Sequence, residues 1–156
     1  MLFLNFILLL VFSCSDDNSN DSGDDRQDRK QHADITAVRA SGSNGSYTFS
    51  VTLSSPDTGC DQYADWWEVL SEDGKLVYRR ILAHSHVNEQ PFARSGGPVG
   101  IDENQTVWIR GHMNTTGYGG QAFKGSVATG FEAAELPDPF ATGVDSQSPL
   151  PGNCAF

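Results

Sequence analysis

Three of the four histidines are spaced so that strand geometry could bring their rings together: His84, His86 and His112. Histidines two residues apart on a strand point to the same side, and a third from a neighbouring strand would complete a three-nitrogen set. Such a set suits zinc or copper, and with one open position it can activate water for hydrolysis. The alternative is that these rings hydrogen-bond loop backbone or face solvent. Candidate fourth donors are Glu68, Glu89 and Met113.

The first two histidines depend on a β-hairpin predicted over residues 66–87. An Asp-Gly step, Asp73-Gly74, lies between an apolar run and a run of β-forming residues, as in tight hairpin turns. In the second strand the branched apolar side chains of Val77 and Ile81 favour one face for the core. The other face would carry Tyr78, Arg80, His84 and His86.

The third histidine lies on a strand predicted over residues 106–113. Val107 and Ile109 alternate with polar and aromatic residues there, so we expect them to point into the core. The same alternation predicts that Trp67 and Val69 of the hairpin face inward. If the three strands are neighbours in one sheet, the histidines share an outer binding face with Glu68, Tyr78, Arg80, Trp108 and Arg110.

The strand pattern predicts an all-β fold. Residues 47–54 alternate cleanly between apolar and polar side chains, and 16 glycines and 7 prolines punctuate the chain. About seven short strands with turns at regular spacing favour a single two-sheet antiparallel β-sandwich. A tryptophan on the third strand makes the pattern resemble immunoglobulin and fibronectin type III domains, and this resemblance implies an immunoglobulin-like strand order.

A second resemblance concerns the histidines. His84, Ser85, His86, Glu89 and Gly96 form a pattern similar to the first motif of cupins, which are metal-binding β-barrels. The His-to-Glu gap is one residue shorter than in that family, and the glycine before the histidines is missing. The cupin resemblance implies His84, His86, Glu89 and His112 as metal ligands.

The N-terminus predicts a targeting segment. Residues 2–12 are almost wholly apolar, too short to span a bilayer but suited to a signal peptide. They end in Val11-Phe12-Ser13-Cys14, which resembles the lipobox of bacterial lipoproteins, although no basic residue precedes the apolar run. The resemblance implies that Cys14 is lipidated and holds the protein to a lipid bilayer of the cell envelope, as an outer membrane lipoprotein.

A charged segment follows this cysteine. Residues 15–34 hold seven Asp against three basic residues, a net charge of −4, and no large apolar side chain. Such a segment cannot bury enough apolar surface to fold, so we expect a flexible tether. An acidic tether resembles the export signal of surface-exposed lipoproteins. The whole chain carries a net charge of −10, which disfavours nucleic acid as a partner.

Two cysteines remain once Cys14 is assigned to lipid. In an oxidising compartment an even pair predicts a Cys60–Cys154 disulfide; the alternatives are two free thiols, or one metal ligand and one spare cysteine. A disulfide would hold a proline-rich tail that otherwise frays. The expected organisation is a signal peptide (1–13), a lipidated acidic tether (14–33), a β-sandwich (34–131) and a C-terminal tail (132–156).

Two hypotheses of function follow. The first is an anchored lipoprotein whose sandwich binds a ligand, a partner protein or a metal ion. The second is a small metal-dependent enzyme, a hydrolase or a cupin-like protein, that uses the same histidines. Two other clusters are weaker candidates. Asp57, Asp61 and Asp65 suit weak calcium binding or simple solvation, and Trp66 and Trp108 suit sugar stacking or packing within the fold.

Overall fold

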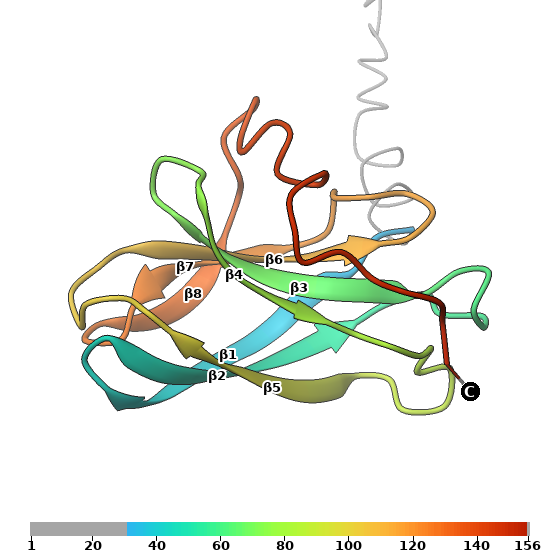
Figure 1. Ribbon diagram of the computed structural model, residues 1–156, viewed down its shortest axis with the longest axis horizontal. Coiled ribbons are helices and arrows are strands. Elements are labelled where there is room, and N and C mark those ends of the chain that lie inside the picture. The colour runs from blue at the N-terminus through green and yellow to red at the C-terminus, as the bar shows by residue number, and fades with distance from the viewer. Residues whose placement is uncertain (1–30, 156) are drawn as a thin grey trace, which may run out of the picture.

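The computed structural model describes residues 31–155 and shows an all-β protein (Figure 1). Every strand pairing is antiparallel. The eight strands are β1 (Asp34–Ser43), β2 (Ser46–Ser54), β3 (Ala64–Ser71), β4 (Leu76–Ile81), β5 (Phe92–Val99), β6 (Val107–Met113), β7 (Ala122–Ser126) and β8 (Gly130–Ala134).

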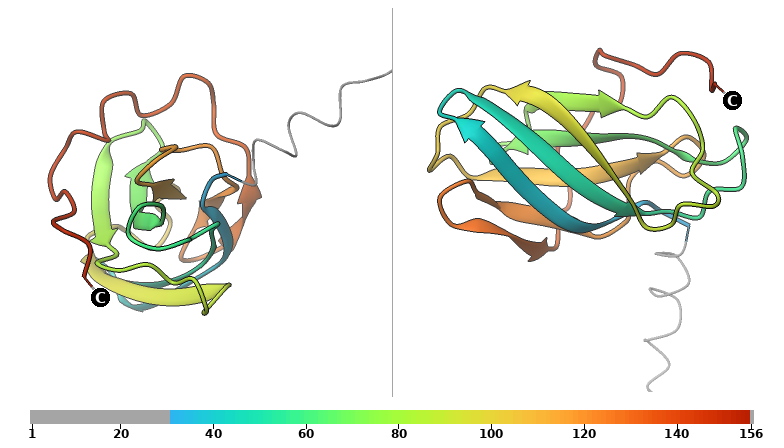
Figure 2. Two further views of the ribbon diagram at one scale, coloured as in Figure 1. Left: turned by 90° about the vertical axis from the view of Figure 1, so that its right-hand side faces the viewer. Right: turned by 90° about the horizontal axis from the view of Figure 1, so that it is seen from below.

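The strands form two sheets that face each other. One sheet has three strands in the order β1-β2-β5, and the other has five in the order β4-β3-β6-β7-β8 (Figure 2). The sandwich is therefore confirmed, with eight strands in place of about seven. The prediction that the hairpin and the 106–113 strand are neighbours is also confirmed, because β3 lies between β4 and β6.

Alternating side chains from both sheets build the core. Phe49 and Val51 of β2 are fully buried against Val69 and Ile109 of the opposite sheet. Each buried side chain of this size stabilises the fold by about 1.5–3 kcal/mol. The inward direction predicted for residues of β3 and β6 is confirmed: Trp67, Val69, Val107 and Ile109 all belong to this core.

Strands β5 and β8 differ from what the sequence predicts. Residues 88–100 contain Gly96, Gly97 and Pro98 and predict an irregular segment with one short edge strand, whereas β5 is a strand of eight residues. Proline is tolerated there because β5 is an edge strand that pairs only with β2. Strand β8 continues the sheet to Ala134, three residues beyond the predicted end of the sandwich at residue 131.

The chain packs against the sandwich earlier than predicted. Ala33 is fully buried, and a Cβ built on Gly111 would lie 2.9 Å from its methyl carbon. The Thr116 hydroxyl donates a hydrogen bond of 2.7 Å to the carbonyl of Gln31. Residues 31–33 of the expected tether therefore contact the sandwich, and residues 14–30 lie outside the described residues.

The C-terminal tail crosses the outer face of the five-stranded sheet. Residues 135–155 contain turns and bends but no strand, and Figure 1 shows this red segment passing over β3. Val144 is buried against Leu70 and Trp108 in a second hydrophobic cluster. Phe140 packs beside it with its ring 5.5 Å from that of Trp108. The tail thus covers the outer face of this sheet and forms a second hydrophobic core with it.

Candidate functional site

Glu68 is the centre of the face beneath the tail. It lies opposite Arg79 of β4 and opposite Arg110 of β6, and directly paired residues of antiparallel strands share a face. Arg79 donates to one carboxylate oxygen, through Nε at 2.8 Å and Nη2 at 2.6 Å. Arg110 Nε donates to the other oxygen at 2.8 Å. Because Glu68 is fully buried, each arginine compensates a charge that water does not reach.

The tail completes the surroundings of Arg79. The guanidinium donates to the backbone carbonyls of Val144 at 2.8 Å, Gln147 at 2.5 Å and Pro149 at 3.2 Å. It also lies over the Trp66 ring, 4.4 Å from the centroid. Arg79 therefore fastens the tail to the sheet while it neutralises Glu68.

Aromatic rings enclose the other side of this charge network. Tyr118 comes from the loop after β6, and the Arg110 guanidinium lies 3.5 Å from its ring centroid. Burial, and then the nearby charge of Glu68, raise the pKa of Tyr118 to about 12. The phenol therefore stays neutral at physiological pH.

Asp65 and His112 form a pair that the sequence did not reveal. His112 Nδ1 lies 2.6 Å from Asp65 Oδ1, and the imidazole stacks on Trp66 at 3.6 Å between centroids. A shift of register between Ala64 and Trp66 places Asp65 at an irregularity of β3. An acidic residue within a largely apolar strand, directly before two tryptophans, was the available signal that this carboxylate is buried and partnered.

The predicted binding face is in part wrong. Glu68, Trp108 and Arg110 lie on the expected outer face, but all three are buried beneath the tail. Trp66 is buried as well, so packing, not sugar stacking on an open surface, occupies both tryptophans. Tyr78 and Arg80 lie on the opposite face: the Tyr78 ring contacts Trp67 of the core, and Arg80 Nε donates to the Ser95 carbonyl of β5 at 3.0 Å.

A bulge in β4 explains this error. Leu70 pairs with Leu76 and Val69 pairs with Tyr78, so Val77 has no partner between them. The extra residue reverses the alternation that had been extrapolated along the strand. Arg79, which strict alternation with Val77 and Ile81 would place on the core face, instead lies on the outer face opposite Glu68.

The three histidines do not form the predicted metal site. Strand β4 ends at Ile81, so His84 and His86 belong to the loop before β5, with their ring centroids 4.5 Å apart. His112 lies on the sheet, where it hydrogen-bonds with Asp65 and stacks on Trp66. Across residues 31–155 no group of three or more His, Cys, Asp or Glu side chains has the arrangement to hold a metal ion. The four-ligand set implied by the cupin resemblance is likewise not assembled.

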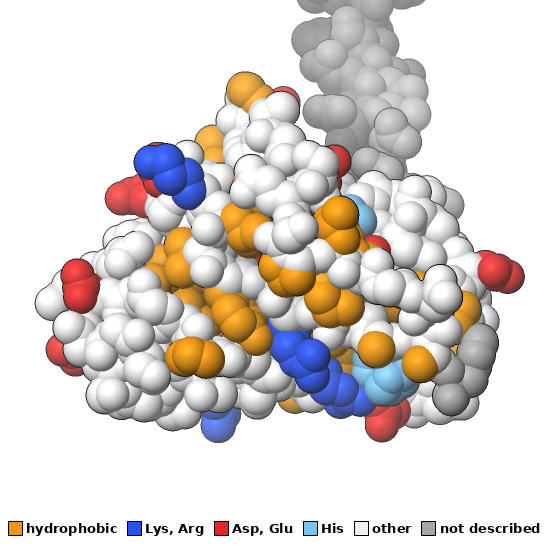
Figure 3. Space-filling model, in the orientation of Figure 1, with side chains coloured by type: hydrophobic (Ala, Val, Ile, Leu, Met, Phe, Trp, Pro, Cys, Tyr) orange, Lys and Arg blue, Asp and Glu red, His pale blue; other side chains and the backbone are white. Residues whose placement is uncertain are grey.

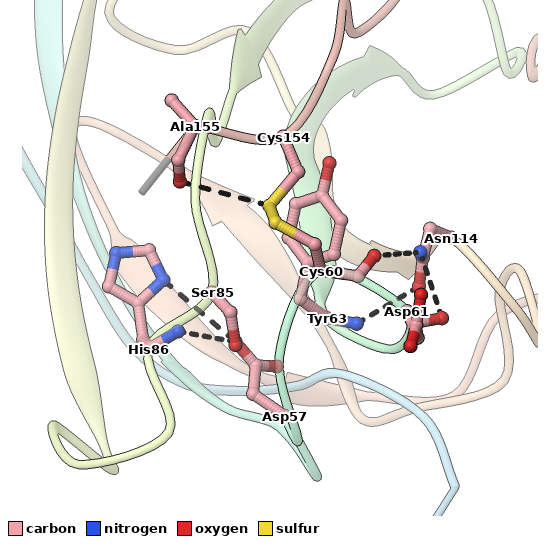
Figure 4. The surroundings of a disulfide bond; sticks show 9 residues. All are labelled: Asp57, Cys60, Asp61, Tyr63, Ser85, His86, Asn114, Cys154 and Ala155. Carbon is pink, nitrogen blue, oxygen red and sulfur yellow. Dashed lines mark hydrogen bonds and ion pairs between the residues drawn. A yellow bond between two sulfur atoms is a disulfide. The ribbon is translucent and has the colours of Figure 1, made fainter.

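Asp57 organises the loop that carries these histidines. Its carboxylate accepts hydrogen bonds from the Ala64 amide at 3.0 Å and the Ser55 hydroxyl at 2.7 Å. It also accepts a hydrogen bond from the His86 amide at 2.7 Å, which Figure 4 shows. It thereby joins the approach to β3 with the loop after β4. Asp57 is thus a buried structural carboxylate. Neither of the two interpretations from the sequence, weak calcium binding or simple solvation, anticipated this role.

The predicted disulfide is confirmed. Cys60 and Cys154 are bonded across 94 residues of sequence, with their Cα atoms 5.6 Å apart (Figure 4). The Ala155 amide then donates to the Ala83 carbonyl at 2.6 Å. The end of the tail is therefore fixed beside the histidine loop.

Two clefts adjoin this histidine loop. One has a volume of about 150 Å³ and is lined by Arg80, Leu82, His84, His86 and Arg94 among others. The other, of about 390 Å³, lies on the side of Ser85 and Glu89 and shares His84 and His86 with the first. The two histidines thus form the wall between two hollows, and the loop is the part of the predicted site that remains reachable from solvent.

The predicted lipidation site lies outside the described residues, since Cys14 precedes residue 31. Within the described part of the chain there is no helix of the length and apolarity required to cross a membrane.

Comparison with known proteins gives one informative relative. A protein of Halomicrobium mukohataei described as "Putative lipoprotein" is 46% identical over 90 residues, which is 57% of this chain and 43% of the relative. The chain therefore spans less than half of that relative's length. Because the matched stretch is longer than the first 30 residues, it includes part of the sandwich. No family model and no solved structure matches the chain.

Proposed function

We propose that the protein is a cell-envelope lipoprotein, anchored through Cys14, whose β-sandwich is a ligand-binding module. The observation that carries the proposal is the 46% identity to a protein described as a lipoprotein. The apolar run that ends in Ser13-Cys14 supports it independently. The acidic segment after Cys14 would hold the domain away from an anionic membrane surface.

Lipid labelling tests the anchor. Cells that express the chain are fed a radioactive fatty acid, and the protein is recovered from the membrane fraction. We expect label in the parent and in the matched control Ser15→Ala, and none in Cys14→Ser. Equal labelling of Cys14→Ser, or an unlabelled parent, would contradict the proposal.

The orientation of the domain is a further part of the proposal. We propose an outer-membrane anchor with the sandwich on the cell surface, on the strength of the resemblance between the acidic tether and known surface-export segments. Treatment of intact cells with a protease should then remove the sandwich while a periplasmic marker stays whole. Protection of the sandwich until the outer membrane is opened would contradict this orientation.

We favour binding over catalysis because of where the charged groups lie. Glu68, Arg79 and Arg110 pair with one another beneath the tail, where a substrate does not reach them. The clefts that a ligand can enter lie at the histidine loop, beside the disulfide. A rigid loop fixed by a disulfide and a buried carboxylate suits recognition, because little ordering is needed on binding.

A further inference from the structure

The cleft between β4 and β5 is lined by both basic and apolar side chains. Arg80 reaches it from β4 and Arg94 from β5, while Leu82 and Ala83 supply the apolar part. In the orientation of Figure 1, a strip of basic side chains meets histidine side chains with an acidic side chain beside them (Figure 3). On a chain with a net charge of −10, such a basic strip is a local exception.

His86 is buried in the wall of this cleft without a hydrogen bond. Only 3% of the residue is exposed, and within residues 31–155 neither ring nitrogen has a hydrogen-bond partner. Nδ1 lies 3.9 Å from Asp57 Oδ2, which is beyond hydrogen-bond length. The ring is nevertheless held in place, because it stacks on the Phe92 ring with 3.8 Å between their centroids. A buried polar group of this kind calls for a partner that these residues do not supply.

The two arginines have hydrogen-bonding capacity to spare. Arg80 donates to the carbonyls of Ser95 and Ile81, and Arg94 donates to Ala93. A guanidinium has five N–H groups, so each arginine retains donors that can meet a ligand. Arginine is also the side chain best suited to bind the oxygens of a phosphate or carboxylate.

The charges around His86 agree with an anion site. Burial first, and then the positive charges of Arg94 and His84, hold the pKa of His86 below its usual value. Asp57 and Glu89 act in the opposite direction but do not outweigh these effects. The ring is therefore neutral at physiological pH, in which state one of its nitrogens carries a proton to donate.

The chain itself already places a carboxylate at this arginine. Glu89 Oε2 accepts a hydrogen bond of 2.7 Å from Arg94 Nη2. The Glu89 side chain is 59% exposed, and such exposed ion pairs are weak and readily exchanged. Glu89 thus competes for the position that a ligand oxygen would take.

We propose that this cleft binds a small oxyanion group, a phosphate or a carboxylate, held by Arg80 and Arg94 with His86 as the buried donor. The inference rests on the proposed function in one respect, that the sandwich is a binding module. The cleft volume of about 150 Å³ is below the roughly 300–1,000 Å³ of pockets for drug-sized ligands, so it accommodates the anionic end of a ligand and not a whole large one.

Titration of the full chain in detergent micelles tests the proposal. Inorganic phosphate and acetate are added separately at constant ionic strength, and the histidine ring resonances are followed by NMR. We expect saturable shifts of His84 and His86 with at least one probe, and a rise in the pKa of His86, because a bound anion favours the protonated ring.

Three variants make the result specific. Loss of a hydrogen bond to a charged group predicts about tenfold or greater weakening for Arg94→Gln, and Arg80→Gln should act in the same direction. Glu89→Gln should tighten binding several-fold, because it removes the internal competitor. The matched control Arg39→Gln, an exposed arginine of β1, should bind as the parent does.

Shifts that fail to saturate, or equal responses in Arg94→Gln and Arg39→Gln, would mean that the anions only screen charge and would overturn the oxyanion site. Weaker binding in Glu89→Gln would overturn it as well. These outcomes can be told apart from those of the lipid-labelling experiment. Fatty-acid labelling without saturable anion binding refutes only the proposed oxyanion site, whereas anion binding without labelling refutes only the proposed lipid anchor.

Discussion

Replacement of Arg79 by methionine should strongly destabilise the fold. The arginine is fully buried with Glu68, and its loss leaves that carboxylate with Arg110 alone. Removal of one partner from a buried ion pair costs about 3–5 kcal/mol. Since Arg110 still pairs with the Glu68 carboxylate, we expect the lower end of this range, about 3 kcal/mol, for Arg79→Met. Small domains are stable by about 5–15 kcal/mol, so this is a large fraction of the total.

A double-mutant cycle isolates the cause. Glu68→Gln already removes the carboxylate that Arg79 pairs with, so Glu68→Gln/Arg79→Met should be less destabilised than the sum of the single variants, by about 2 kcal/mol. Urea unfolding followed by circular dichroism gives each free energy. Arg39→Met, at an exposed position of β1, is the control and should stay within about 0.5 kcal/mol of the parent.

The tail supplies a second readout for the same variant. Three tail carbonyls, those of Val144, Gln147 and Pro149, lose their donor in Arg79→Met. We therefore expect faster proteolysis within residues 135–150 of this variant than of the Arg39→Met control. A free-energy change below about 1 kcal/mol with an unaltered cleavage rate would refute the role given to Arg79.

Three further outcomes follow from the fold. Replacement of both cysteines of the disulfide, Cys60→Ser with Cys154→Ser, should lower the free energy of unfolding by up to roughly 4–5 kcal/mol; an unchanged urea midpoint would contradict this. The pKa of His86 is lowered in the fold, so the unfolded chain binds its proton more tightly and stability falls as pH drops below about 6.5. His86→Phe should therefore lose less stability than the parent between pH 7.5 and 5, and an equal loss would show that other groups cause it. Gly74→Ala should cost about 1–2 kcal/mol or more, measured by thermal unfolding, because Gly74 has φ of +79° and a Cβ there would lie 3.1 Å from the backbone of Ala141.

The sandwich itself could be predicted because local patterns in the sequence agree with it. Residues 47–54 alternate so regularly that only one face of β2 can be buried, and the structure buries Tyr47, Phe49, Val51 and Leu53. The pairing of Cys60 with Cys154 followed from counting cysteines in an oxidising compartment. Neither inference needed to know which strands lie side by side.

The candidate site could be predicted only in part because it depends on register. Extrapolation of alternation along β4 failed at Val77, where the bulge inserts a residue without a partner. From Tyr78 to the end of β4 the assigned faces were therefore reversed, so Arg79 lies opposite Glu68 while Tyr78 and Arg80 lie on the other face. A bulge depends on how two strands pair and pack, so the sequence of either strand alone does not predict it.

The amino-acid sequence by itself determined the class of fold, the disulfide and the inward direction of β2, β3 and β6, because hydrophobic alternation and cysteine count are local properties. The tertiary structure alone decided that the tail covers the face of Glu68, that Asp65 holds His112, and that His86 is buried between two clefts. The physical reason is that a polar side chain gains a defined partner only when packing removes water from it, and that packing joins residues distant in the sequence.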